Sequence, residues 1–374
     1  MKQHNFNLLL TVLFCLFIGG MFLGSILLPD RTFSQLENRN LAAAPKLSWE
    51  TVTTGTFMED AEDYVNDQII GRDFWVALKA WSERVSGKQE NNGVYFAKED
   101  TLISRVDTPE QSTLDTNAVY VNALVDNVDV PVYFGIIPSA AEIWSDRLPE
   151  GAPTADEKAI IDRLYDAVQT HTIDLYSALA QHKDEDLYYR TDHHWTSLGA
   201  YYGYTALMDA MGLEAVPLDE SQKVTVSEDF YGTLFSSSGV RWLPPDHIDR
   251  YISDEGVTVT AYPNGTPEPG SLYVDSYLEV KDKYSSFLGG NKPLCVIETE
   301  HTGAPKVLVI RDSYADSLAP FLTQNFSEIH LFDPRYNLNS VQEYAAQNEI
   351  DSIVVLYSIS NFTAKDNQLF VLGR

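Results

Sequence analysis

Short apolar runs that alternate with amphipathic segments constrain the fold of this chain more than any other feature. Val132–Ile137 is rich in β-branched and aromatic residues and is bounded by Pro131 and Pro138, as expected of a buried parallel strand. Alternating strands and helices predict an α/β fold with a doubly wound, mostly parallel sheet, whose ligand sites lie beyond the carboxyl ends of the strands. Further strands are predicted at 172–176, 307–310, 329–332 and 353–356, and helices at 112–128, 157–168, 197–211, 315–322 and 341–347.

Residues 214–300 interrupt this alternation. They contain short β-type runs separated by Gly, Pro, Asn and Asp, at 224–226, 257–262 and 272–274. We interpret the region as an inserted segment with antiparallel strands that contributes to the rim of a site. The predicted organisation is a membrane anchor at 1–28, a stalk and helical lead-in at 29–111, and a main domain at 112–374 that carries the insertion.

The N-terminal run Leu8–Leu28 contains no charged residue and is long enough as a helix to cross a bilayer core of about 30 Å. Lys2 and the free amino terminus precede the run, which favours a cytoplasmic N-terminus and an extracytoplasmic main domain. A cleaved signal peptide is the alternative. Its small-residue match at Ala42–Ala44 lies well past the apolar run, so we expect an uncleaved single-pass anchor in the cell membrane.

Charge and cysteine content exclude some partners and frameworks. The chain of 374 residues has a formal net charge of −28 and shows no basic stripe, so nucleic acid is not expected as a partner. Its two cysteines, Cys15 and Cys295, lie far apart, so no disulfide framework is predicted. We interpret Cys295, between Leu294 and Val296, as a small buried hydrophobic residue.

Two stretches more than a hundred residues apart carry side chains suited to nucleophilic catalysis. Ser313 lies between the predicted strand at 307–310 and the predicted helix at 315–322, in a sharp turn at the carboxyl edge of the sheet. Its backbone N–H would be close to a helix N-terminus, where an oxyanion is stabilised. In the earlier stretch, His194 could accept the serine proton. Asp192 could orient the ring, because residues two apart in an extended segment share a face. The residues therefore predict a Ser-His-Asp triad.

Each of these residues also has another explanation. A serine before an apolar helix is a common N-cap. Asp192, His193 and His194 could bind a divalent metal ion, since carboxylate and imidazole groups suit zinc. Adjacent histidines rarely reach one ion together, and no third ligand with convincing spacing stands nearby. We therefore predict no metal and no cofactor, and we expect His193 beside the triad rather than in it.

Further side chains are candidates for contacts with substrate or oxyanion. Arg335 follows the predicted strand at 329–332, where its cation could hold an acyl oxygen or a sugar hydroxyl, or could pair with Asp333 at the surface. Asn361 could supply a second oxyanion donor, although a loop asparagine usually serves a turn. Aromatic residues cluster around the proposed base, where some could stack on sugar rings and most would serve the core. The remaining candidates are His193, Trp195 and Tyr314.

Four separated motifs give the chain a resemblance to a known family. They are Phe33–Arg39, Asp192-His193-His194-Trp195, Lys283–Asn291 and Arg311-Asp312-Ser313-Tyr314. With these motifs in this order, the chain resembles the DHHW proteins, relatives of the alginate O-acetyltransferase group, from roughly the membrane segment to the C-terminus. The resemblance implies a permuted, SGNH-hydrolase-like catalytic domain. Arg311 stands where a GDS-type block carries glycine.

The resemblance also implies a function, that of a membrane-anchored extracytoplasmic O-acetyltransferase acting on a cell-surface or exported polysaccharide. Ser313 would carry the acetyl group, His194 would act as base and then acid, and Asp192 would orient the ring. A multi-pass membrane O-acyltransferase is the implied partner, which would bring acetyl groups across the membrane. Two alternatives stay open: a carbohydrate acetyl-esterase with the same triad, and a non-catalytic polysaccharide-binding or assembly protein.

Overall fold

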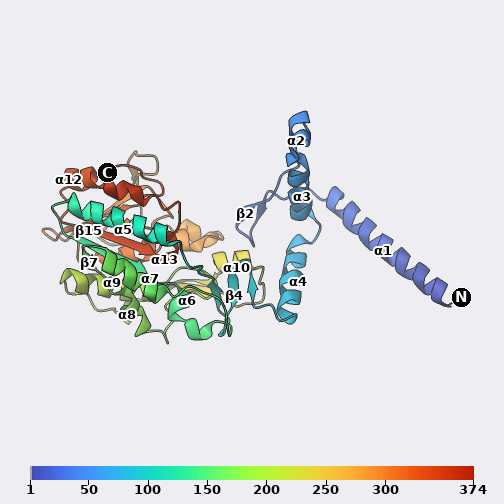
Figure 1. Ribbon diagram of the computed structural model, residues 1–374, viewed down its shortest axis with the longest axis horizontal. Coiled ribbons are helices and arrows are strands. Elements are labelled where there is room, and N and C mark those ends of the chain that lie inside the picture. The colour runs from blue at the N-terminus through green and yellow to red at the C-terminus, as the bar shows by residue number, and fades with distance from the viewer. Residues whose placement is uncertain (1) are drawn as a thin grey trace. The chain divides into compact units, whose positions relative to one another are not determined.

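A computed structural model describes residues 2–374 and divides the chain into two compact units. The first unit contains the residues up to Lys88 together with Ser236–Trp242. The second unit contains Gln89–Phe235 and Leu243–Arg374. Figure 1 labels many of the helices and strands, which are numbered in chain order.

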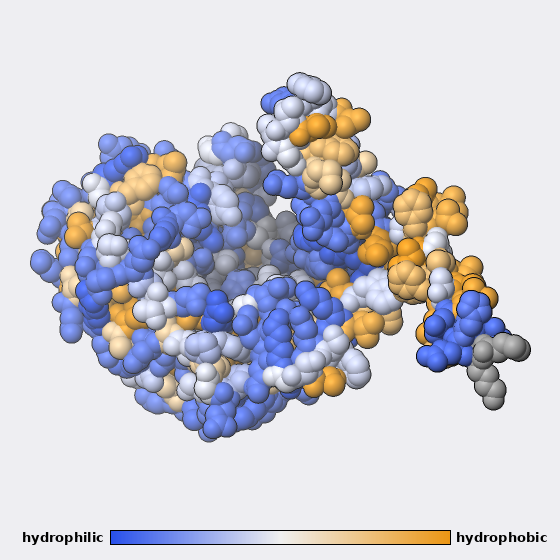
Figure 2. All heavy atoms as spheres, turned by 45° about the vertical axis from the view of Figure 1, so that its right-hand side comes forward, coloured by the Kyte–Doolittle hydropathy of each residue, from blue (hydrophilic) through white to orange (hydrophobic). Residues whose placement is uncertain are grey.

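The first unit begins with an apolar helix, α1 (Lys2–Leu27). The helix is long and apolar enough to cross a membrane, with a mean hydropathy of 2.3, and hydrophobic residues gather along it in Figure 2. The other elements of this unit are the β1 (Phe33–Ser34) and β2 (Arg39–Asn40) pair and the helices α2 (Trp49–Thr54), α3 (Thr56–Gln68) and α4 (Arg72–Val85). The length and composition of α1 therefore fit a single-pass anchor.

Ion pairs fix the juxtamembrane motif Phe33–Arg39 against α3 and α4. Arg72 Nη2 lies 2.6 Å from Glu37 Oε2, and Arg39 Nη2 lies 2.5 Å from Asp67 Oδ1. Burial opposes the charge of Asp67, but the hydrogen bond from Arg39 is the larger effect and lowers the pKa of Asp67 to about 2. The motif thus has a structural role within the first unit.

The second unit is built on an eight-stranded mixed sheet, and the prediction of an α/β fold is confirmed. The central and distal strands β14, β13, β15, β6 and β7 run parallel, whereas β12, β10 and β11 add antiparallel pairs at one side. In spatial order the strands are β11 (Glu268–Pro269), β10 (Thr258–Ala261), β12 (Leu294–Glu298), β14 (Glu328–Phe332), β13 (Lys306–Arg311), β15 (Ser352–Ser358), β6 (Val132–Ile137) and β7 (His171–Thr172).

Helices cover this sheet and enclose its core. The β13 residues Val307–Ile310 are fully buried, because a central parallel strand has helices over both faces. In Figure 1, α5 and α12 are drawn above β15, and α8 and α9 below it. The helices of this unit are α5 (Gln111–Asp126), α6 (Ala140–Ile143), α7 (Glu157–Ala167), α8 (Leu175–Ala180), α9 (Ser197–Met211), α11 (Ala315–Leu322), α12 (Val341–Gln347) and α13 (Ile359–Phe362).

The predicted strand at 172–176 is wrong beyond its first residue. The strand β7 ends at Thr172, and α8 begins at Leu175. The Asp174 carboxylate accepts the backbone N–H of Ser177 at 3.0 Å and so caps the helix. In the sequence, an edge strand of two residues followed by a capped helix shows the same apolar pattern as one short strand, so the pattern does not distinguish the two structures.

The region 214–300 has the expected antiparallel strands, but it also extends the main sheet. The strands β8 (Val224–Phe230) and β9 (Asp246–Arg250) form a separate pair, while β10, β11 and β12 join the sheet edge next to β14. The predicted strand at 272–274 is reduced to a single bridge between Tyr273 and Phe287. Smaller elements are β3 (Glu90–Asn91), β4 (Val94–Phe96), β5 (Leu102–Ser104) and α10 (Thr233–Ser238).

Candidate active site

Ser313 lies in the turn between β13 and α11, at the carboxyl edge of the sheet. The neighbouring carboxylate of Asp312, which is fully buried, shapes this turn. Its Oδ1 accepts the N–H of Tyr314 at 3.0 Å, while its Oδ2 accepts the N–H and hydroxyl of Ser358 at 2.9 and 2.6 Å. Asp312 therefore ties the serine turn to the end of β15.

Arg311, the last residue of β13, is fully buried as well. Its Nη1 lies 2.9 Å from Asp316 Oδ1 in the first turn of α11 and 3.2 Å from Asn291 Oδ1. Burial raises the pKa of Asp316 to about 6, although the Arg311 cation opposes this shift. Arg311, which stands where a GDS-type block carries glycine, thus links the end of β13 to the first turn of α11.

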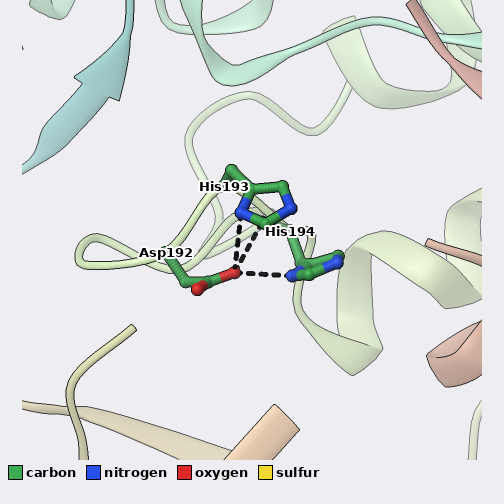
Figure 3. A group of neighbouring side chains, drawn as sticks. All are labelled: Asp192, His193 and His194. Carbon is green, nitrogen blue, oxygen red and sulfur yellow. Dashed lines mark hydrogen bonds and ion pairs between the residues drawn. The ribbon is translucent and has the colours of Figure 1, made fainter. Parts of the chain in front are cut away.

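Asp192, His194 and Ser313 form one continuous chain of contacts. His194 Nδ1 lies 2.6 Å from Asp192 Oδ1, and His194 Nε2 lies 2.8 Å from Ser313 Oγ. Figure 3 shows the Asp192 carboxylate directed at both neighbouring imidazoles. In the tautomer that donates Nδ1–H to Asp192, Nε2 is free to accept the serine proton. This arrangement can activate a hydroxyl as a nucleophile.

The Asp192 carboxylate is held in its charged form. Its Oδ2 accepts the N–H of Thr233 at 2.7 Å, and its Oδ1 accepts the N–H of His194 at 3.0 Å. Burial opposes the charge, but the imidazoles of His193 and His194 and these hydrogen bonds hold the pKa of Asp192 well below its usual range. A charged Asp192 can stabilise the imidazolium that forms when His194 accepts a proton.

Trp195, Tyr314 and His193 join the two stretches to each other. The Trp195 indole is fully buried and donates its N–H to the carbonyl oxygen of Tyr314 at 2.8 Å. The buried Tyr314 donates its hydroxyl to the carbonyl oxygen of His193. Burial leaves the rings of Trp195 and Tyr314 no free face for a sugar, in contrast to the expectation of substrate contacts.

His193 lies beside the contacts that join Asp192, His194 and Ser313, and it remains partly accessible. Its ring centroid is 3.9 Å from that of His194, its Nδ1 is 2.7 Å from Thr233 Oγ1, and 37% of its side chain is exposed. Burial of the ring and the neighbouring His194 lower the pKa of His193 below its ordinary value. His194 Nδ1 and Asp192 Oδ1 share a hydrogen bond, so a metal ion bound to these two atoms would have to displace it.

Arg335 and Asn361 reach the same sheet edge and are both engaged by carboxylates. Arg335 Nε and Nη2 donate to the two oxygens of Asp333 at 2.9 and 2.7 Å, which is the ion-pair alternative considered for it. Asn361 Nδ2 donates to Asp312 Oδ2 at 2.8 Å. Each side chain has at least one further N–H, so an oxyanion contact stays a prediction for both.

Two contributors to the site carried no clear sequence signal. Thr233, the first residue of α10, supplies the N–H that fixes Asp192 Oδ2. Tyr284, in the Lys283–Asn291 motif, donates its hydroxyl to the carbonyl oxygen of Ser313 at 2.9 Å. Only the motif resemblance could have pointed to Tyr284, since neither residue lies near the triad in the sequence.

Solved structures share this fold. A DHHW family protein from Eubacterium siraeum aligns with a TM-score of 0.66 and 25% identity, over 75% of this chain and 95% of that chain. PatB1 from Bacillus cereus, solved with a sulfonyl adduct, aligns with a TM-score of 0.62 and 21% identity, over 75% of this chain and 98% of that chain. The O-acetyltransferase domain of Pseudomonas putida AlgJ reaches a TM-score of only 0.46 at 15% identity, over 73% of this chain and 93% of that chain, which supports no inference.

One sequence comparison identifies a family. No curated protein gives a significant match to the chain. The family described as DHHW protein matches residues 108–332, which is more than half of the chain and includes Asp192, His194 and Ser313. The chain therefore belongs to the DHHW protein family.

Proposed function

We propose that this protein is a membrane-anchored, extracytoplasmic O-acetyltransferase that modifies a cell-surface or exported polysaccharide. The observation that carries the proposal is the unbroken chain of contacts from Asp192 through His194 to Ser313. Membership of the DHHW family supports the same reading. The apolar helix α1 supports an anchor, and we place its N-terminus in the cytoplasm.

The proposed reaction has two acyl-transfer steps. His194 Nε2 takes the hydroxyl proton of Ser313 as Oγ attacks the acetyl carbonyl carbon, and the proton then passes to the leaving group of the donor. A sugar hydroxyl next gives its proton to His194 and attacks the acetyl-serine ester. The acetyl group leaves on the sugar and Ser313 recovers its proton. The Ser313 N–H, with Arg335 or Asn361, would stabilise each tetrahedral oxyanion.

The donor side of the reaction requires a partner. A single α1 helix cannot form a path for acetyl groups, and the extracytoplasmic side holds no acetyl-CoA of its own. We therefore propose a multi-pass membrane O-acyltransferase as the acetyl donor. An anchored enzyme has a high effective concentration near such a donor, so a weak contact between the two proteins suffices.

The central test compares Ser313→Ala with Ser340→Ala in the full chain, purified in detergent. Ser340 caps α12 by accepting the N–H of Glu343 at 3.2 Å. Its replacement by alanine removes one serine hydroxyl and should lower the free energy of unfolding by about 1 kcal/mol, as the loss of a serine cap typically does. A small acetyl ester serves as donor, with and without oligosaccharide acceptors, and mass spectrometry follows acetyl-serine and acetylated sugar.

Only Ser313→Ala should abolish both products, and a chelator should not affect the wild-type rate. Product that forms only with water as acceptor would make the protein an esterase. Activity that survives in Ser313→Ala with an unchanged melting temperature would refute the nucleophile. Inhibition by a chelator that added zinc reverses would support a metal site instead.

The anchor is tested separately. Residues 1–28 are replaced by a cleavable export signal, and polysaccharide acetylation is measured in cells. Loss of acetylation at equal protein level would support coupling to a membrane donor. Full acetylation by the secreted form would show that no anchored partner is needed.

A further inference from the structure

The aromatic ring of Tyr284 lies flat against the imidazole of His194. The two ring centroids are 3.8 Å apart, and the ring planes differ by only 9°. Tyr284 belongs to a short 3-10 helix, Lys283–Ser286, in the region between the two halves of the triad, and only 5% of the residue is exposed. One face of the proposed base is therefore covered by a phenol ring.

The hydroxyl group of Tyr284 contacts the nucleophile's backbone. It donates to the carbonyl oxygen of Ser313 at 2.9 Å and lies 3.1 Å from Ser317 Oγ in α11. Tyr189 and Phe287 pack against the ring, with centroids 6.3 and 5.6 Å away. A single buried side chain thus fixes both the plane of His194 and the turn that carries Ser313.

The stacking of Tyr284 on His194 has an electrostatic consequence for the protonated form of the His194 imidazole. A cation over the face of an aromatic ring is attracted by the negative face of its quadrupole, more strongly where water is excluded. In the proposed reaction, His194 is such a cation while it holds the serine proton. The groups that face His194 are the Asp192 carboxylate, the Ser313 hydroxyl, the rings of His193, Tyr284 and Tyr314, and, at longer range, the Asp316 carboxylate.

We propose that Tyr284 is a positioning residue, which fixes the plane of the His194 imidazole and stabilises the imidazolium formed during acyl transfer. The proton moves from Ser313 Oγ to His194 Nε2, and Tyr284 itself neither forms a bond nor gives up a proton. The proposal rests on the proposed function, because an imidazolium forms during acyl transfer only if His194 is the base.

The test uses two substitutions of Tyr284 in the full chain. Tyr284→Phe keeps the ring over His194 and removes only the hydroxyl, whereas Tyr284→Leu removes the ring. Tyr273→Leu is the matched control, because Tyr273 packs on the same Phe287 at 6.0 Å while its hydroxyl donates to the carbonyl oxygen of Ile252. Circular dichroism and melting temperature verify the fold of each variant.

Two readouts separate positioning from mere packing. With a small acetyl ester, Tyr284→Leu should lower kcat by about tenfold or more at nearly constant KM, and Tyr284→Phe should lower kcat less, because it loses only the hydroxyl contact to the Ser313 turn. In NMR titrations of the His194 ring signals, the midpoint should move to lower pH in Tyr284→Leu and stay near the wild-type position in Tyr284→Phe. Tyr273→Leu should change neither quantity.

A folded Tyr284→Leu protein with wild-type kcat and an unmoved His194 midpoint would refute the proposal. If Tyr284→Leu does not fold, pentafluorophenylalanine at position 284 keeps the ring shape and reverses its quadrupole. It must then lower the His194 midpoint relative to Tyr284→Phe, or the proposal fails. The NMR readout requires no turnover, so a wild-type protein without acyl transfer would count against the proposed function and leave the stacking result interpretable.

Discussion

Replacement of Arg311 by methionine should destabilise the second unit far more than the loss of an ordinary ion pair. Arg311 and Asp316 are both buried, with side-chain exposures of 0% and 2%, and their charged atoms are 2.9 Å apart. Removing one partner leaves a buried carboxylate without compensation, which typically costs about 3–5 kcal/mol. The matched variant Lys306→Met removes a partly exposed pair to Glu328 from the same strand and should cost at most about 1 kcal/mol.

The cost of Arg311→Met should also depend on pH, in a direction that follows from Asp316. The pKa of this carboxyl is already raised to about 6 from its ordinary value of 3.8. Without the cation it rises further, so the folded state binds a proton more tightly than the unfolded state does. Stability is then lost as pH rises from about 4 through the folded-state pKa, because the slope follows the difference in bound protons. The destabilisation should be larger at pH 8 than at pH 5.

Urea unfolding at both pH values, followed by circular dichroism, measures these differences. The double variant Arg311→Met/Asp316→Leu should recover part of the loss, since it removes both charges, and a coupling of about 0.5–3 kcal/mol is expected for residues in contact. A cost below that of Lys306→Met, or equal costs at pH 5 and pH 8, would refute the electrostatic argument. If the free-energy changes of the two single variants add up to that of the double variant, the interaction between Arg311 and Asp316 would be refuted.

Two further predictions concern other buried groups. Burial raises the pKa of the fully buried Glu157 to about 7 from 4.5, so stability should fall as pH rises through this window. Glu157→Gln should therefore be more stable than wild type at pH 8 by up to about 3 kcal/mol, and identical urea midpoints at pH 8 would contradict this. A Cβ at Gly232 would lie 2.2 Å from Asp192 Cβ and 2.3 Å from its Oδ2, so Gly232→Ala should displace the carboxylate and lower kcat by at least about tenfold. Gly373→Ala, with its nearest neighbour at 3.6 Å, should leave kcat unchanged, and equal rates for both alanine variants would disprove the displacement.

Much of the sheet could be predicted from sequence because buried parallel strands leave an unambiguous pattern. Val307–Ile310 is an uninterrupted apolar run, and the predicted helices at 197–211 and 341–347 have the observed bounds. The strand β10 was harder to place, since its residues alternate between buried and exposed positions. This pattern fits a strand near the border of the main sheet, between β11 and β12, as well as a strand of a separate cap.

The environment of the triad could not be predicted, because it depends on contacts between distant segments. Spacing alone placed Asp192 and His194 on one face of an extended stretch, and the structure joins them at 2.6 Å. By contrast, sequence reasoning expects an arginine at the surface, whereas Arg311 is fully buried. The buried Arg311 finds its partners in Asp316, in the first turn of α11, and in Asn291, in another motif. Such partners are visible only after folding.

The contact between His194 and Ser313 joins positions 119 residues apart, so other interactions must hold the two stretches in register. Trp195 and Tyr314 supply a pair of crossed hydrogen bonds between the stretches, one buried and one partly buried, and both are independent of the serine hydroxyl. A catalytic group is positioned well when its neighbours, rather than its own reactive atoms, fix its geometry. Removal of the Ser313 hydroxyl should therefore leave the fold and the Asp192–His194 contact intact. Because the hydrogen bonds that hold the two stretches do not involve the Ser313 hydroxyl, Ser313→Ala tests the proposed nucleophile without a change in the fold.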